Sequence, residues 1–288
     1  MHSFLIALFL AIALSLFSAR LQAAGRAFFE RRPAAVFLVP AALTALFAIA
    51  LAAAGGWSAP FLLLVAAYTF LATALVYARR GWLGFAAVFL LWLPIEFAAG
   101  RDLLPRAAWG IASLTARGTA VTLALVLFLL FRKMSGMKYN LPRSWRDALY
   151  PALGFVAVAP PLVALGLWLG YMGPFLGFAR FHAAAFAWLW LKTALGVALP
   201  EELLFRALIQ NWLMQRFGFS WRTLAASALI FGASHLDNPP GPLPNWRYMI
   251  LATIAGFVLG RVFWKSSSIW SSAALHALVN ASRHTFFG

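Results

Sequence analysis

The sequence contains no cysteine and only seven acidic residues in 288 positions. Without cysteine, disulfides, thiolate metal sites and cysteine nucleophiles are all excluded. Charged residues of both signs make up 10% of the chain, whereas soluble domains average about 25%. Hydrophobic residues make up 64%. A protein core of ordinary size cannot hide so much apolar surface from water, so lipid must be the solvent for much of this chain.

Long apolar runs indicate which segments of the chain could cross the bilayer. A helix that crosses about 30 Å of hydrocarbon needs roughly 20 apolar residues. Runs near this length cover residues 3–19, 34–54, 59–78, 82–98, 118–132, 150–171, 178–217, 222–236, 247–264 and 269–285. We therefore predict an all-α fold, a polytopic transmembrane bundle of about nine to eleven helices. The run 178–217 is either one helix kinked near Pro200 or two helices, and 99–116 is a loop or an interfacial helix.

Positive charge dominates, with 23 Lys and Arg against 7 Asp and Glu and a net charge of +16. The basic residues fall mostly in short gaps between apolar runs, as in cytoplasmic loops and headgroup contacts. No basic stripe lies on a polar fold, so nucleic acid is not an expected partner. The longest polar stretch is strongly basic and divides the chain. We predict N-terminal transmembrane helices of unknown role (1–133), a basic cytoplasmic linker (134–149) and a C-terminal half (150–288).

The first apolar run, Phe4 to Phe17, fits either a signal peptide or a membrane anchor. Small residues at Ala23 and Ala24 would suit a cleavage site. No Lys or Arg precedes the run, however, and arginines at positions 20, 26, 31 and 32 follow it. That order of charges favours an uncleaved span whose N-terminus lies outside.

Two adjacent glutamates fall at membrane depth, in the segment ALPEELLFRALIQNWL. An ionisable side chain there costs about 2.5–3.5 kcal/mol, so it needs a local reason. Pro200 suits a first helical turn, where the helix dipole would also favour Glu201 and Glu202. Glu202 and Arg206 are four residues apart and can pair on one helix face. Glu201 points about 100° away and must be protonated or served by another helix.

Three further polar residues fall in the late apolar runs. His235 follows Phe231 by four residues, and His276 precedes Asn280 by four, so His276 and Asn280 share one helix face. Taken singly, each could be structural, since an interhelical hydrogen bond in a membrane is worth about 0.6 kcal/mol. Together with the glutamates, they place several polar side chains that are costly to bury within one short part of the chain. A common functional site explains why so many lie together.

The chain thus contains three motifs: Glu201-Glu202-x-x-x-Arg206, Phe231-x-x-x-His235 and His276-x-x-x-Asn280. They resemble the signature of the CPBP family, the CAAX-protease and bacteriocin-processing group of intramembrane peptidases, also called ABI proteins. All three are intact and in order within residues 195–285, about a third of the chain. The resemblance implies a hydrolase whose helical bundle encloses a catalytic cavity inside the membrane. Residues 150–288 would then form a CPBP-like intramembrane peptidase domain.

The resemblance also implies roles for the motif residues. Glu201 would act with His235 to activate the water that attacks the scissile carbonyl. The Glu–Arg pair would hold the site in shape. His276 and Asn280 would stabilise the oxyanion. All six residues, Glu201, Glu202, Arg206, His235, His276 and Asn280, are therefore expected catalytic-site residues.

A metal is the open point of this mechanism. Glu201, His235 and His276 could serve as zinc ligands, because one Glu and two His leave a coordination position for water. The sequence lacks HExxH, the common helical zinc signature. We therefore favour a glutamate-type protease that needs no cofactor, with a zinc metalloprotease as the alternative.

The expected partners are the lipid bilayer and a peptide or membrane-anchored protein substrate, such as one with a C-terminal signal. Arg greatly outnumbers Lys and Ala is abundant, which hints at a GC-rich bacterial genome and a multi-pass protein of the inner membrane. Prenylated substrates are not expected there. Two other functions stay open: a non-enzymatic membrane scaffold, and a proton-coupled transporter in which buried Glu and His relay protons. No internal repeat is evident, which counts weakly against a transporter.

Overall fold

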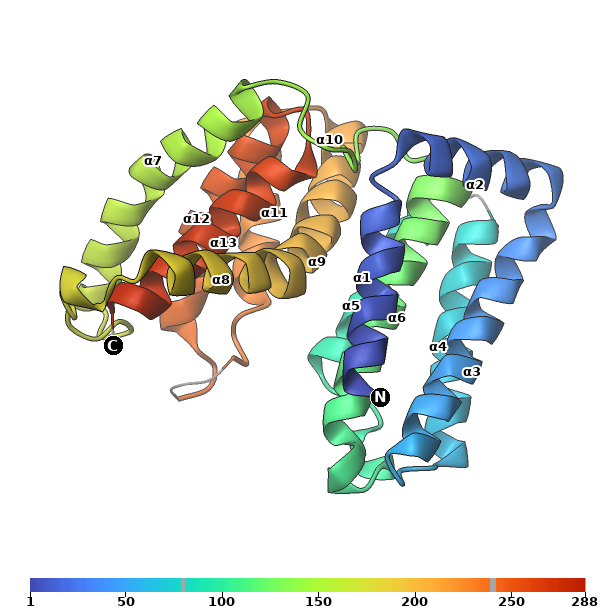
Figure 1. Cartoon of the computed structure of the whole chain (residues 1–288). Helices are drawn as coiled ribbons and strands as arrows, with labels where there is room; N and C mark the ends of the chain where they lie inside the picture. Colours follow the sequence, from blue (N-terminus) through green and yellow to red (C-terminus); the bar gives the residue numbers. More distant parts are fainter. Residues whose placement is uncertain (79–80, 239–241, 288) are drawn as a thin grey trace. The chain divides into compact units, whose positions relative to one another are not determined.

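The protein is built from helices in both of its compact units. The computed structural model describes residues 1–78, 81–238 and 242–287. These residues contain 11 helices and no strand beyond one isolated bridge between Phe175 and Phe287. The prediction of an all-helical polytopic bundle is confirmed. The two units are Met1–Ser135 and Gly136–Gly288, coloured blue to green and green to red in Figure 1.

The described part of the N-terminal unit packs around one helix, α6. Its helices are α1 (His2–Ser15), α2 (Ala19–Arg31), α3 (Leu38–Ala53), α4 (Ala59–Tyr77), α5 (Gly81–Glu96) and α6 (Trp109–Ala124). Helix α6 continues as a π-helical segment through Phe131, and α1, α3 and α5 all contact it. Gly118 lets α1 approach closely, because a Cβ at this position would overlap the ring of Phe9.

The chain bends sharply between α1 and α2. The two helices meet at 90°, and the Ser18 hydroxyl accepts a hydrogen bond from the Leu21 N–H where α2 begins. The apolar run 3–19 therefore yields a helix of only 14 residues, shorter than the roughly 20 that a bilayer requires. The expected straight first span is replaced by a bent pair of helices.

The C-terminal unit contains one long helix and four shorter ones. Its named elements are α7 (Arg146–Trp168), α8 (Ala183–Thr193), α9 (Leu199–Glu202), α10 (Asn211–Phe217), α11 (Trp221–Ala233), α12 (Trp246–Lys265) and α13 (Ile269–Phe286). Helices α8, α9 and α10 are parts of one continuous helix, Ala183–Phe217. Helix α12 contacts α7, α11 and α13, and the Trp190 indole N–H donates to the Ala274 carbonyl, which joins the long helix to α13.

Of the two alternatives for residues 178–217, one kinked helix or two helices, the structure has one continuous helix, Ala183–Phe217, which runs through Pro200. Two π-helical segments, Ala194–Ala198 and Leu203–Gln210, flank the short α-helical turn that contains Pro200. Proline removes one backbone N–H and its ring clashes with the carbonyl four residues earlier, and a wider π turn absorbs that clash without ending the helix. Glu201 and Glu202 therefore lie in mid-helix, and the argument that placed them in a first turn was wrong.

Six helices among the described residues are long and apolar enough to cross a membrane: 33–53, 59–77, 106–131, 146–168, 183–217 and 246–265. The protein is thus an integral membrane protein. The expected spans 222–236 and 269–285 form α11 and α13, which are not among the six. Helix α11 has only 13 residues, and α13 carries serine, histidine and asparagine side chains. The stretch 99–116 is neither one loop nor one interfacial helix, because α6 begins within it at Trp109.

Two glycines bring α12 close to its neighbours, as their Gly-x-x-x-Gly spacing indicates. A Cβ on Gly256 would lie 2.8 Å from the Phe231 ring of α11. A Cβ on Gly260 would lie 2.5 Å from the side-chain oxygen of Gln210, whose amide donates to the Gly260 carbonyl over 2.9 Å. The glycines thus hold α12 against both α11 and the long helix.

A lysine from the loop before α7 closes the C-terminal end of α12. The Lys138 ammonium lies 2.8 Å from each of three carbonyl oxygens, those of Phe263, Trp264 and Ser266. Burial lowers the pKa of Lys138 to about 8, and the nearby Asp147 carboxylate opposes this shift. At pH 7 the side chain is therefore mostly an ammonium, whose three donors match the three acceptors.

Replacing Lys138 by Met should lower the free energy of unfolding by about 1.5–3 kcal/mol, because three carbonyls lose a charged donor. Lys265→Met is the matched control, since Lys265 is an exposed lysine at the same helix end and should change stability by about 0.5 kcal/mol or less. Denaturant unfolding in detergent micelles measures both. Equal losses in the two variants would show that only general positive charge matters there.

Candidate active site

A fully buried ion pair lies on the long helix. The Arg206 Nε atom is 3.2 Å from the Glu202 Oε2 atom, and both side chains are 0% exposed. The Phe231 ring of α11 covers the guanidinium, with 4.5 Å between the Arg206 Cζ atom and the ring centroid. The two terminal guanidinium nitrogens have no hydrogen-bond partner among the described residues. Such a pair is expensive to bury, so it indicates a role beyond simple stabilisation.

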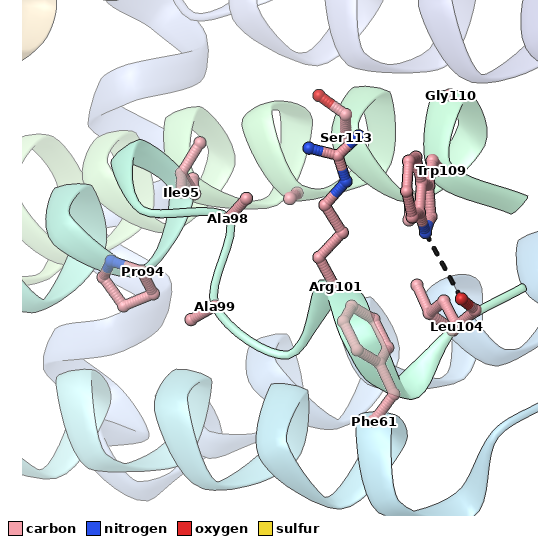
Figure 2. Close-up of a pocket in the computed structure, with 12 residues that line it drawn as sticks. Phe61, Pro94, Ile95, Ala98, Ala99, Arg101, Leu104, Trp109, Gly110 and Ser113 are labelled. Carbon is pink, nitrogen blue, oxygen red and sulfur yellow. Dashed lines mark hydrogen bonds between the residues drawn. The ribbon is translucent and has the colours of Figure 1, made fainter. Parts of the chain in front are cut away.

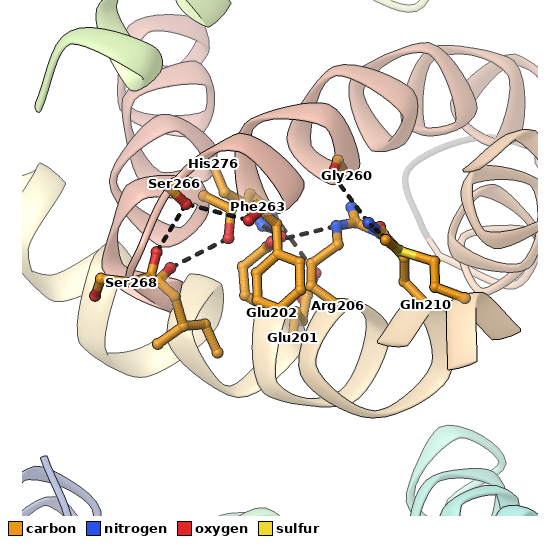
Figure 3. Close-up of polar contacts among 12 residues, drawn as sticks. Glu201, Glu202, Arg206, Gln210, Gly260, Phe263, Ser266, Ser268 and His276 are labelled. Atoms are coloured by element: carbon orange, nitrogen blue, oxygen red, sulfur yellow. Dashed lines mark hydrogen bonds and ion pairs between the residues drawn. The ribbon is translucent and has the colours of Figure 1, made fainter. Parts of the chain in front are cut away.

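His276 connects this pair to α13 and contacts both glutamates. Its Nδ1 atom lies 3.1 Å from Glu202 Oε1, within hydrogen-bond distance. Its Nε2 atom lies 3.7 Å from Glu201 Oε2, which is too long for a direct hydrogen bond. Figure 3 shows the two glutamates and Arg206 on the long helix, with His276 facing them from α13. Glu202 therefore orients the imidazole, whose other nitrogen points toward Glu201.

Glu201 differs from its neighbour in exposure. Its side chain is 33% exposed, whereas that of Glu202 is 0% exposed. The contact with His276 comes from another helix, which is one of the two alternatives that the sequence left for this glutamate, the other being protonation. No direct contact between Glu201 and His235 is present in the described part of the chain. Glu201 is therefore the more accessible of the two carboxylates.

His235 lies just beyond the end of α11, where its ring caps the helix. The Nδ1 atom is 2.9 Å from the Phe231 carbonyl oxygen and 3.1 Å from the Ser234 hydroxyl. In the tautomer that donates from Nδ1 to this carbonyl, Nε2 keeps its lone pair and can accept a proton. The rings of Phe231 and Tyr248 contact the imidazole edge-on, at centroid distances of 4.9 and 4.5 Å. These contacts fix the direction of the free nitrogen.

An apolar cavity of about 400 Å³ adjoins these groups. Its lining is mainly aromatic and aliphatic, and three of the predicted residues, His235, His276 and Asn280, belong to it. Glu201, Glu202 and Arg206 are not among its lining residues, but His276 contacts both glutamates and Phe231, which also lines the cavity, covers Arg206. The structure thus brings five of the six predicted residues into one connected network around Phe231 and His276, with Asn280 on the same cavity wall as His276.

Sequence reasoning missed four polar residues of this cavity: Tyr171, Tyr248, Ser282 and Arg283. The two tyrosine rings stack at 5.0 Å, and the Arg283 guanidinium lies 4.6 Å from the centroid of Tyr171. A signal for Arg283 was present, because it follows His276 by seven residues and so shares its helix face. Nothing in the sequence pointed to the tyrosines, which come from a loop and from α12.

Three of these side chains were also the candidate zinc ligands. No group of three or more His, Asp or Glu side chains close enough together to hold a metal ion occurs among the described residues. His235 places Nδ1 on a backbone carbonyl and leaves Nε2 free, as zinc-bound histidines do. The 3.7 Å between Glu201 Oε2 and His276 Nε2 is close to the spacing of two ligands on one tetrahedral zinc ion. The zinc alternative on Glu201, His235 and His276 therefore stays open.

Comparison with known proteins locates the family in this same part of the chain. Residues 182–282 match the Rce1-like family model, whose description reads type II CAAX prenyl endopeptidase Rce1-like. Residues 182–282 of the C-terminal unit are thus similar to an Rce1-like domain. The matched segment includes all six predicted site residues and about a third of the chain, and the N-terminal unit lies outside it. The curated proteins contain no match, and neither do the solved structures.

An Rce1-like domain is an intramembrane protease domain, and that coarse assignment agrees with the membrane-spanning helices around it. The family resemblance drawn from the three motifs is confirmed.

Proposed function

We propose that this protein is an intramembrane endopeptidase in which Glu201 is the general base for the attacking water. The observation that supports it best is His276, because this one ring contacts both glutamates and also lines the apolar cavity. Glu201, the exposed one of the two carboxylates, does not line the cavity itself but would act on a substrate peptide there from beside His276.

The proposed roles of the other site residues follow from their positions. The free Nε2 atom of His235 would exchange a proton with the water or with the leaving amine. His276 and Asn280 share one wall of the cavity and would donate to the oxygen of the tetrahedral intermediate. The buried Glu202–Arg206 pair would hold His276 in orientation without touching the substrate. Water, carboxylate and imidazole suffice for peptide hydrolysis, and no step in this scheme requires a metal.

The cavity indicates the class of substrate. Its walls are mainly aromatic and aliphatic, so they suit an apolar segment entering from the bilayer. Arg283 places a positive charge on the same lining, which suits the free carboxylate of a C-terminal signal. We propose a membrane-anchored or C-terminal-signal protein of the bacterial inner membrane as the substrate, without a prenyl group.

The test is a cleavage assay in detergent on a library of tagged, membrane-anchored substrates. His235→Gln should lower cleavage by about 10²–10⁴-fold, because the substitution removes the imidazole and its proton-accepting nitrogen. His284→Gln is the matched control, since His284 is exposed and lies on α13 outside the cavity lining; it should retain full activity.

A chelator arm separates the two mechanisms. Cleavage that survives chelator supports the glutamate-type scheme, while cleavage lost to chelator and restored by zinc would replace it with a metalloprotease. Full activity in His235→Gln would contradict the assignment of that residue. No cleavage by the wild-type protein on any library member would favour the scaffold.

A further inference from the structure

A second pocket lies in the N-terminal unit, which no part of the peptidase scheme uses. It has a volume of about 370 Å³. Its walls come from the start of α4, the end of α5, the loop that follows α5, and the first two turns of α6. Figure 2 shows Arg101 extending from the loop across this space toward α6. The pocket is thus built from four separate segments of one compact unit.

The loop over the pocket is held in place by its backbone. Ala98 and Gly100 both have positive φ angles, of 45° and 78°, which let the chain reverse direction tightly. Gly100 packs directly on α4, since a Cβ there would lie 2.6 Å from Leu64 and 3.1 Å from Phe61. On the opposite wall the Trp109 indole N–H donates to the Leu104 carbonyl over 3.3 Å. The pocket therefore has a preformed shape.

Arg101 brings a positive charge that no described carboxylate neutralises. Its guanidinium lies 3.6 Å from the centroid of the Trp109 ring. Among the described residues, no carboxylate lies within ion-pair distance of it. Glu96, at the end of α5, is engaged by the Trp92 indole N–H over 2.7 Å. The described lining contains no acidic side chain at all, so an anionic group is the complementary ligand.

The position of the pocket indicates that this anionic group belongs to a lipid headgroup. Helices α4 and α6 belong to candidate membrane spans, and the pocket lies where α4 and α6 begin and α5 ends. The ends of spanning helices lie at headgroup level, where Trp side chains such as Trp109 are enriched. Most of the remaining lining is apolar: Phe61, Pro94, Ile95, Leu104 and several alanines. A ligand with a charged end and an apolar body fits both features.

We propose that this pocket is a binding site for an anionic glycerophospholipid. The phosphate pairs with Arg101, the Ser113 hydroxyl donates to it, and the glycerol and upper acyl carbons lie against the apolar wall. In Figure 2 the polar ends of Arg101 and Ser113 lie toward the same side of the pocket. Because no acidic side chain lines the described pocket to pair with a choline or ethanolamine group, the site prefers lipids with net negative charge. The proposal does not depend on the peptidase activity.

The experiment measures retained lipid by native mass spectrometry of the full chain from nanodiscs of phosphatidylcholine with phosphatidylglycerol. Arg101→Gln should retain about tenfold less phosphatidylglycerol, because it removes the charged partner of the phosphate. Arg106→Gln is the matched control. Arg106 is an exposed arginine of the same loop whose guanidinium lies 5.9 Å from the Trp109 ring centroid, but it does not line the pocket. Ser113→Phe, which fills the pocket without changing charge, should also lose lipid.

Three results would overturn the proposal. Equal losses in Arg101→Gln and Arg106→Gln would mean general attraction of the loop to a negative surface. Equal retention of phosphatidylcholine and phosphatidylglycerol by the wild-type protein would remove the preference for anionic lipid. Displacement of the lipid by millimolar inorganic phosphate would show that the pocket takes a free anion. Thermal unfolding of each variant confirms that a loss of lipid is not a loss of fold.

Discussion

Glu201→Gln is expected to lower the rate of substrate cleavage by about 10²–10⁴-fold, the usual effect of removing a general base. The amide has nearly the same shape as the carboxylate but cannot accept the proton of the attacking water. Because the Glu201 side chain is 33% exposed and makes no direct hydrogen bond with His276, the thermal midpoint should change little. A large rate loss at constant stability is the signature of a reacting group.

The control for this substitution is Asp237→Asn, which also neutralises one acid. Asp237 is exposed and only two residues from His235, so it tests whether local charge alone affects activity. It should retain near wild-type cleavage. If Glu201→Gln retains activity while Glu202→Gln abolishes it, the two glutamates have the opposite roles, and the buried one is the base.

The second large effect is expected in stability. Removing one member of the buried Glu202–Arg206 pair, as in Glu202→Leu or Arg206→Met, should lower the free energy of unfolding by about 3–5 kcal/mol. Each substitution leaves the other charge buried without a partner, and the terminal guanidinium nitrogens already lack hydrogen-bond partners. The double variant, Glu202→Leu with Arg206→Met, should recover most of that loss because no charge then remains to be desolvated.

Activity should separate from stability in this double-mutant cycle. The stable double variant should still be inactive, because His276 loses the carboxylate that orients its Nδ1 atom. The Glu30–Lys133 pair of the N-terminal unit is the control, with side chains 57% and 39% exposed, and its removal should cost less than about 1 kcal/mol. Recovery of cleavage in the double variant would show that the pair serves stability alone.

How much of this could be predicted depends on which interactions are local. Apolar runs alone indicate membrane helices, because length and composition decide insertion. The Glu202–Arg206 contact follows from a spacing of four residues, and for Glu201 the sequence left two alternatives, protonation or a partner from another helix. The identity of that partner could not be predicted, because the packing of α13 against the long helix is tertiary. The sequence reasoning paired Glu201 with His235, whereas the described structure places it near His276.

The errors have physical causes as well. Pro200 was taken as a helix start because proline suits a first turn, but π turns let the helix continue through it. The bend after Ser15 was missed, since the apolar run continues past it to Phe17 while the helix does not. The cavity residues Tyr171 and Tyr248 lie on a loop and on α12, far from any motif. Their proximity to His235 is a property of the packed bundle.

The π turns on either side of Glu202 make the direction of its side chain depend on how many residues the long helix contains. Each π turn holds more residues than an α turn, so the direction of every side chain upstream depends on the length of the segment 203–210. Loss of a single residue there would allow an ordinary α-helix to form, and the chain would remain helical. The preceding side chains would nevertheless rotate by about 100°, and both glutamates would turn away from α13. In this helix the number of residues is therefore constrained as tightly as their identity, which single-residue deletions would expose.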